Sequence, residues 1–176
     1  FFMPNLVGGI VLGYIWQLII NGILSYSCVT ITYDPSYGFW GLVVLMNWQM
    51  IGYMMIIYIA GIGNIPKDLI DAAKVDGASS WGILRHVIIP MVMPSVTICL
   101  FLTITNAFKL FDANLALTDG APSRKTAMLA LDIYKTFYGS VGSQGTGQAK
   151  AVIFFLLLGI VSRIQLSITR KREVEA

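Results

Sequence analysis

Charged side chains are scarce in this sequence of 176 residues: 12% are Asp, Glu, Lys or Arg, against about 25% in a typical soluble domain. Residues 1–66 contain a single charged side chain, Asp34, and residues 87–108 contain none. Such stretches cannot form a water-facing surface, which excludes a soluble monomer. The apolar content of 56% also excludes intrinsic disorder, which requires low hydrophobicity and high net charge. The sequence therefore predicts a protein of the lipid bilayer.

Other absences exclude particular kinds of scaffold, binding site and partner. Only two cysteines are present, too few for a disulfide scaffold, and no bridge is expected between Cys28 and Cys99. The single histidine, His86, has no Cys, Asp or Glu around it at metal-ligand spacing, so no metal site is predicted. The net charge of +3 gives no argument for a nucleic-acid partner. No G-x-x-x-x-G-K-[ST] phosphate loop occurs, so any ATP must be hydrolysed by another protein.

Four apolar stretches are long enough for membrane-spanning helices, since a hydrocarbon core of about 30 Å needs about 20 residues. They cover about residues 6–24, 39–63, 90–108 and 151–169, and they predict an all-α, polytopic transmembrane helical bundle. Arg163 interrupts the last stretch, and its long stem can reach the interface, so we interpret it as a boundary anchor. The chain starts Phe1-Phe2-Met3-Pro4 without an initiator Met, so we expect it to begin inside a longer protein.

The distribution of Lys and Arg predicts the orientation of the bundle. The cluster Arg170-Lys171-Arg172 indicates a cytoplasmic C-terminus. Four alternating spans then place residues 64–90 in the cytoplasm, where Lys and Arg recur, and residues 25–38, which lack both, outside. The long loop 109–148 is predicted to be external despite its basic residues, because long loops follow the charge rule poorly.

The residue pattern of the predicted cytoplasmic segment, residues 64–90, predicts two short helices that meet at an angle. Asn64 is expected to cap the first helix, which continues to Val75 and is broken at Gly77. Ser79 or Ser80 is expected to cap the second. One interpretation is an interfacial helix pair without a further role. The other is a docking element, because small residues allow another protein to approach closely.

Pro90 is expected to end or kink the second helix just before the third span. With it, the segment resembles the EAA loop of binding-protein-dependent ABC transporter permeases. Relative to that family, Asp71 replaces a Glu, Leu84 an aromatic residue and Ile89 a Leu. The resemblance implies that the segment couples to an ATPase through Asp71, Ala72, Ala73, Asp76, Gly77, Ala78, Leu84 and Pro90.

Further stretches are similar to sugar-transporting members related to the maltose and multiple-sugar permeases: residues 2–9, 117–122, 133–137 and 170–173. This resemblance implies the type I ABC importer permease fold, with six core helices of which two N-terminal ones are missing here. It also implies a bacterial or archaeal plasma membrane location and no cofactor bound by this chain. The implied partners are an ABC ATPase dimer that uses ATP, a second and different permease subunit, and an external solute-binding protein.

Candidates for the substrate path are polar and aromatic residues inside or at the ends of the spans, because sugars need hydrogen bonds and apolar faces. Such residues also bond between helices, so contact with substrate remains open for each. Gly9-x-x-x-Gly13 is more simply a close packing face, and residues 126–138 predict a surface helix. The candidates are Gln17, Asn47, Trp48, Gln49, Tyr53, Asn106, Phe108 and Phe111.

Several alternative functions share the hydrophobic composition. A permease for another solute, such as an amino acid or glycerol phosphate, would carry the same cytoplasmic loop. An ion-coupled secondary transporter is a weaker alternative, because no acidic residue lies inside a predicted span. A membrane-embedded enzyme is disfavoured for the same reason, since a nucleophile–base set or metal triad is missing from the spans.

Overall fold

The computed structural model describes residues 2–139 and 142–170, and every regular element in these ranges is helical. Four helices are long and apolar enough to cross a membrane, which confirms the predicted all-α membrane bundle. One of them is built from three consecutive pieces: α4 (Ser80–Ile83), a π-helical turn (Leu84–Ile88) and α5 (Ile89–Phe108). The other three are α1 (Gly9–Leu24), α2 (Pro35–Gly63) and α8 (Gln144–Arg170).

The helices begin at residues that local chemistry favours. The segment before α1, Met3–Leu6, forms a short 3-10 helix with Pro4 in its first turn, so α1 itself starts only at Gly9. At the start of α2, the backbone N–H of Ser36 donates to the Asp34 carboxylate at 2.7 Å. This hydrogen bond holds the pKa of Asp34 below its usual value.

Helix α8 begins at Gln144, seven residues before the apolar stretch that indicates it in the sequence. Its first turns pass close to α7 (Leu129–Tyr138), where a Cβ on Gly147 would lie 2.9 Å from Phe137 Cα. Only glycine allows this approach, so a residue with low helix propensity is used inside a helix. The Lys171, Arg172 and Glu173 positions of the predicted basic end lie outside the described residues.

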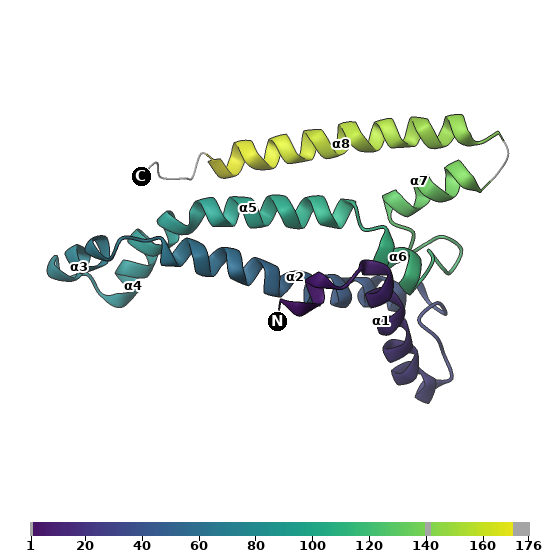
Figure 1. Ribbon diagram of the computed structural model, residues 1–176, viewed down its shortest axis with the longest axis horizontal. Coiled ribbons are helices and arrows are strands. Elements are labelled where there is room, and N and C mark those ends of the chain that lie inside the picture. The colour runs from purple at the N-terminus through teal and green to yellow at the C-terminus, as the bar shows by residue number, and fades with distance from the viewer. Residues whose placement is uncertain (1, 140–141, 171–176) are drawn as a thin grey trace.

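Helices α2, α5 and α8 run side by side with α5 in the middle, whereas α1 lies across one end of the bundle (Figure 1). The amide of Gln165 on α8 donates to the Thr97 carbonyl of α5 at 3.3 Å. Most apolar side chains on the spans are exposed, as expected for surfaces that face lipid or other subunits. The buried apolar core is small and lies near α1: Ile31, Leu42, Leu45, Ala113 and Leu117.

Candidate functional site

The coupling segment, defined as residues 64–90, projects from the bundle at the end opposite to α1 (Figure 1). Its first helix is α3 (Lys67–Val75), in which no residue is buried. Val75 is 87% exposed and Trp81, on α4, is 69% exposed. Val75 lies outside the four spans and Trp81 in the first turn of the third, so this chain leaves both apolar side chains free to contact another molecule or lipid.

The turn between α3 and α4 has the conformation that the sequence predicts. Gly77 has φ +79, a value that favours glycine, and its N–H donates to the Lys74 carbonyl at 3.0 Å. The next N–H, of Ala78, donates to the Ala73 carbonyl at 2.9 Å. A Cβ added at Gly77 would meet no atom within 4 Å. The chain itself therefore leaves the space over this turn open.

Of the two serines considered as caps, Ser79 caps α4: its hydroxyl oxygen accepts a hydrogen bond from Gly82 N–H at 3.2 Å. The prediction that Asn64 caps α3 is wrong. Asn64 ends α2 instead, and its N–H donates to the Ala60 carbonyl at 3.1 Å. The turn into α3 passes through Pro66, which offers no side-chain oxygen, and α3 starts at Lys67.

The expectation that Pro90 ends a helix before the third span is wrong, because helical residues continue from Ser80 to Phe108. Proline lacks an N–H and its ring clashes with the carbonyl of the preceding turn in a regular α-helix. Here the preceding turn, Leu84–Ile88, is a wider π turn, and Pro90 falls in the first turn of α5. The coupling segment is therefore continuous with a membrane span.

The residues that match the EAA loop fall into two groups. Asp71, Ala72, Asp76, Gly77 and Ala78 are exposed on α3 and its turn. An exposed ion pair joins Asp71 to Lys74 at 2.8 Å. The remaining matches are partly buried against neighbouring turns: Ala73, Leu84 and Pro90.

A polar pocket of about 280 Å³ lies at the C-terminal end of α5, beside the middle of α2. It brings together three of the substrate-path candidates, Gln49, Asn106 and Phe111. Amide groups beside an aromatic face suit a hydroxyl-rich ligand. Its walls also include residues that were not predicted from the sequence: Asn5, Met46, Met50, Lys109, Leu110, Asp112 and Ala113.

The other candidates do not line this pocket. The Asn47 amide donates to the Val43 carbonyl of its own helix at 2.8 Å. Trp48 packs edge-on against Trp16 with 5.6 Å between ring centroids, and Tyr53 stacks on Phe2 at 6.2 Å. Phe108 is partly buried outside the pocket. Gln17 serves the packing of helices, because its amide donates to the Leu117 carbonyl at 3.0 Å.

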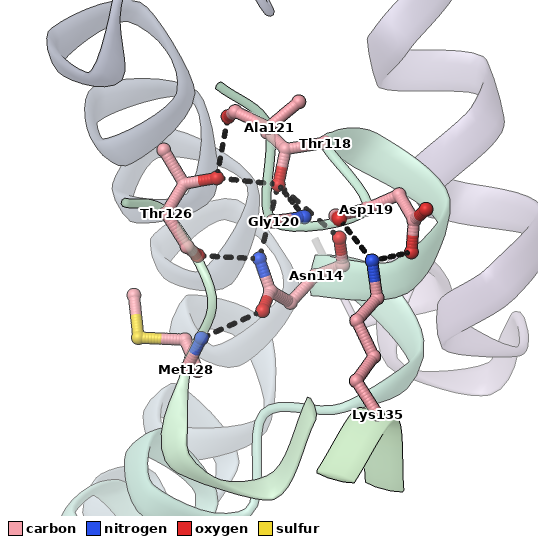
Figure 2. Close-up of polar contacts among 8 residues, drawn as sticks. All are labelled: Asn114, Thr118, Asp119, Gly120, Ala121, Thr126, Met128 and Lys135. Carbon is pink, nitrogen blue, oxygen red and sulfur yellow. Dashed lines mark hydrogen bonds and ion pairs between the residues drawn. The ribbon is translucent and has the colours of Figure 1, made fainter. Parts of the chain in front are cut away.

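The pocket wall is carried by α6 (Asp112–Leu117), which a buried polar cluster fixes in place (Figure 2). The side chain of Asn114 is fully buried, and its amide nitrogen donates to Thr118 Oγ1 at 3.1 Å and to the Thr126 carbonyl at 2.9 Å. Its amide oxygen accepts from Met128 N–H at 2.8 Å. One side chain thus closes the loop between α6 and α7.

Two further contacts hold the same loop. Lys135 on α7 forms an ion pair with Asp119 at 2.7 Å and donates to its carbonyl (Figure 2). On the other side, a Cβ added at Gly13 would lie 2.5 Å from Ala116 Cβ of α6, which confirms that the Gly9–Gly13 pair is a close packing face. The predicted surface helix 126–138 exists as α7, although it begins at Leu129 because Thr126 is buried in the polar cluster.

Together, the four-span bundle, the projecting helix pair and the polar pocket define a multi-pass membrane protein of the transport class. The family described as "Binding-protein-dependent transport system inner membrane component" matches residues 1–174. The chain belongs to this family.

Named relatives agree with this assignment. The chain is 48% identical to the "Probable starch degradation products transport system permease protein AmyD" of Thermoanaerobacterium thermosulfurigenes, over 99% of this chain and 62% of that protein. It is 28% identical to the "Trehalose/maltose transport system permease protein MalF" of Thermococcus litoralis, over 97% of this chain and 60% of that protein. The chain thus spans about six-tenths of the length of these relatives.

A solved structure shares the fold. The crystal structure of a bacterial ABC transporter involved in the import of the acidic polysaccharide alginate contains a chain that superposes with a TM-score of 0.75 at 18% identity. The match covers 97% of this chain and 63% of that one. At this identity the likeness shows the fold alone, that is, the arrangement of the helices.

Proposed function

We propose that the protein is the permease subunit of an ATP-driven importer that moves a sugar or an oligosaccharide across a bacterial or archaeal plasma membrane. A separate pair of ATPase subunits hydrolyses ATP, an external binding protein delivers the solute, and a second, different permease subunit completes the path. The C-terminus then lies in the cytoplasm. Family membership supports the transport role, and the relatives named for starch products and for trehalose or maltose support the solute class.

The observation that carries the proposal is the open turn of the coupling segment. Gly77 is exposed, holds a left-handed conformation and leaves room for another surface directly above it. Insertion of this turn into a cleft of an ATPase subunit would bury side chains that the isolated chain leaves exposed. Closure of two ATPase subunits would then move the helix that begins at Ser80 and alter access to the pocket.

The pocket supports the solute class. Gln49 and Asn106 offer amide donors and acceptors, Phe111 offers a ring face, and Lys109 and Asp112 add one charge of each sign. Such a balanced lining favours a neutral solute that is rich in hydroxyl groups over a strongly charged one. In the proposed orientation the pocket lies beside the outer end of α5 and the middle of α2, where it can receive solute from the external side.

The proposal is tested with the complete complex reconstituted in proteoliposomes, in which uptake of labelled maltooligosaccharides, amino acids and glycerol phosphate is measured with and without ATP. ATP-dependent uptake of the sugars is expected. The Gln49→Ala variant should raise the KM for sugar, whereas Asn47→Ala, on the same helix outside the pocket, should leave it unchanged. Uptake of amino acids alone would overturn the sugar assignment, and sugar uptake without ATP would overturn the coupling.

A further inference from the structure

Helix α8 carries two arginines that have no anionic partner among the described residues. Arg163 and Arg170 are both exposed. The ion pairs among the described residues join Asp71 to Lys74, Asp119 to Lys135 and Asp132 to Lys150, and none involves α8 beyond Lys150. A guanidinium without a counter-ion is costly in a membrane span, so these two groups require an anion or water.

The two arginines lie on one face of α8. Their separation of seven residues is two helical turns, or about 10 Å along the axis. They line a shallow, open cleft of about 510 Å³ on the surface of α8, and no carboxylate is among its walls. The other walls are a glycine, a leucine and two serines: Gly159, Ser162, Leu166 and Ser167.

An apolar groove adjoins this cleft. It has a volume of about 260 Å³ and lies between α5 and α8, with Leu166 and Arg170 belonging to both cavities. On α5 its wall extends from Pro94, near the coupling segment, to Leu102, deeper in the span. The groove therefore leads from the level of Arg170 toward the middle of the bilayer.

We propose that this composite site binds a phospholipid with an anionic head group. The phosphate lies between Arg163 and Arg170, and one acyl chain follows the groove between α5 and α8. Guanidinium groups bind phosphate through paired N–H donors, and the serine hydroxyls add further donors. The bilayer supplies such a molecule at high local concentration, and the described residues of this chain bury only 6% of the apolar window of α8.

Charge complementarity favours a lipid over a protein subunit as the occupant. An apolar subunit surface on this face would leave two cations buried without partners. One phospholipid molecule can occupy the whole site. Its charged head group lies in the cleft beside the arginines, and its acyl chain lies in the adjoining apolar groove.

The test is native mass spectrometry of the purified complete complex, incubated with equal amounts of dioleoyl-phosphatidylglycerol and dioleoyl-phosphatidylcholine. The wild-type complex should retain phosphatidylglycerol preferentially. In R163Q/R170Q the preference should fall about thirtyfold, as expected for the loss of two interfacial cations. R163K/R170K, which keeps the charge, should retain most of it. The matched control is R124Q/K125Q, which removes two exposed cations from the external loop.

A photo-crosslinking amino acid in place of Ser167, in an otherwise wild-type complex, identifies the occupant directly and does not depend on the stability of the arginine variants. Crosslinks to phospholipid in membranes support the proposal. Crosslinks to another subunit of the complex would overturn it, as would an R163Q/R170Q complex that retains phosphatidylglycerol as well as the wild type does.

Discussion

At the α6 end of the molecule, Asn114, Thr118 and Thr126 are buried and bonded to one another and to nearby backbone groups. At the α3 end, no residue of the helix is buried, and the ion pair between Asp71 and Lys74 is open to water. Both ends consist of short helices joined by turns that contain a glycine with positive φ, Gly120 in one and Gly77 in the other.

The two ends differ in whether their polar groups are bonded within this chain or left exposed to other molecules. The α6 end satisfies its polar groups internally, so its geometry is fixed by this chain alone and can shape the wall of a pocket. The coupling segment keeps its exposed groups for another molecule. Substitutions at the first end should therefore change stability, and substitutions at the second should change association.

The largest effect is expected for Asn114→Leu. The change leaves the Thr126 carbonyl and the Met128 N–H buried without partners, which should lower the free energy of unfolding by about 3 kcal/mol. Thermal unfolding in detergent measures this. The control is Asn106→Leu, at an exposed amide, with an expected change below about 0.5 kcal/mol. Equal stability of N114L and the wild type would show that the cluster does not fix this end.

Gly13→Ala should lower the free energy of unfolding by about 2 kcal/mol, because the new methyl group would lie 2.5 Å from Ala116 Cβ. The same substitution at Gly22 of the same helix, where nothing lies within 4 Å, should be neutral or slightly stabilising. The double variant G13A/A116G should recover stability, and failure to recover would place the cost elsewhere than in this contact.

At the opposite end, Gly77→Val should reduce co-purification of the ATPase about tenfold, since the left-handed turn disfavours a branched residue and the added bulk stands on the docking surface. The unfolding temperature of the permease alone should change little. Gly77→Asn tolerates the left-handed conformation and should retain more of the ATPase. Undiminished recovery of the G77V complex with normal transport would contradict the docking role.

The smallest effect is expected for Lys74→Gln, which should change the free energy of unfolding by less than about 0.5 kcal/mol because both partners of its ion pair are exposed. Lys150→Gln should cost more, about 1 kcal/mol, because Lys150 also donates to Thr136 Oγ1 at 2.8 Å and links α8 to α7. Chemical unfolding in detergent measures both changes in the free energy of unfolding, so the same Lys→Gln substitution is compared at the two ends. Equal changes would contradict the proposed difference in stability between the two ends.

The membrane class and the number of spans were predictable because a helix that crosses lipid must be long and apolar, and both properties can be read directly from the amino-acid sequence. The break at Gly77 was predictable because its cause is local. The start of α8 at Gln144 was not, because Gly145 and Gly147 are poor helix formers, and the close approach of Gly147 to Phe137 is a tertiary effect.

The candidate site was predicted in part for the same reason. Gln49, inside the second span, and Asn106 and Phe111, near the outer end of the third, stand out as polar or aromatic residues. Lys109 and Asp112 resemble ordinary loop residues, and only the fold of α6 against α1 brings them into the pocket. The π turn before Pro90 was likewise not predictable from the sequence. A proline indicates that one helix hydrogen bond is missing, but not which backbone conformation replaces it.

The uninterrupted helix from Ser80 to Phe108 gives the molecule a mechanical element. Twenty-nine helical residues rise about 43 Å, long enough to reach from one water phase to the other. The helix includes the π turn Leu84–Ile88 and Pro94, two features at which a helix can bend. A displacement of the Ser79–Gly82 cap would therefore be divided between bending at these points and movement of Asn106, inside the pocket.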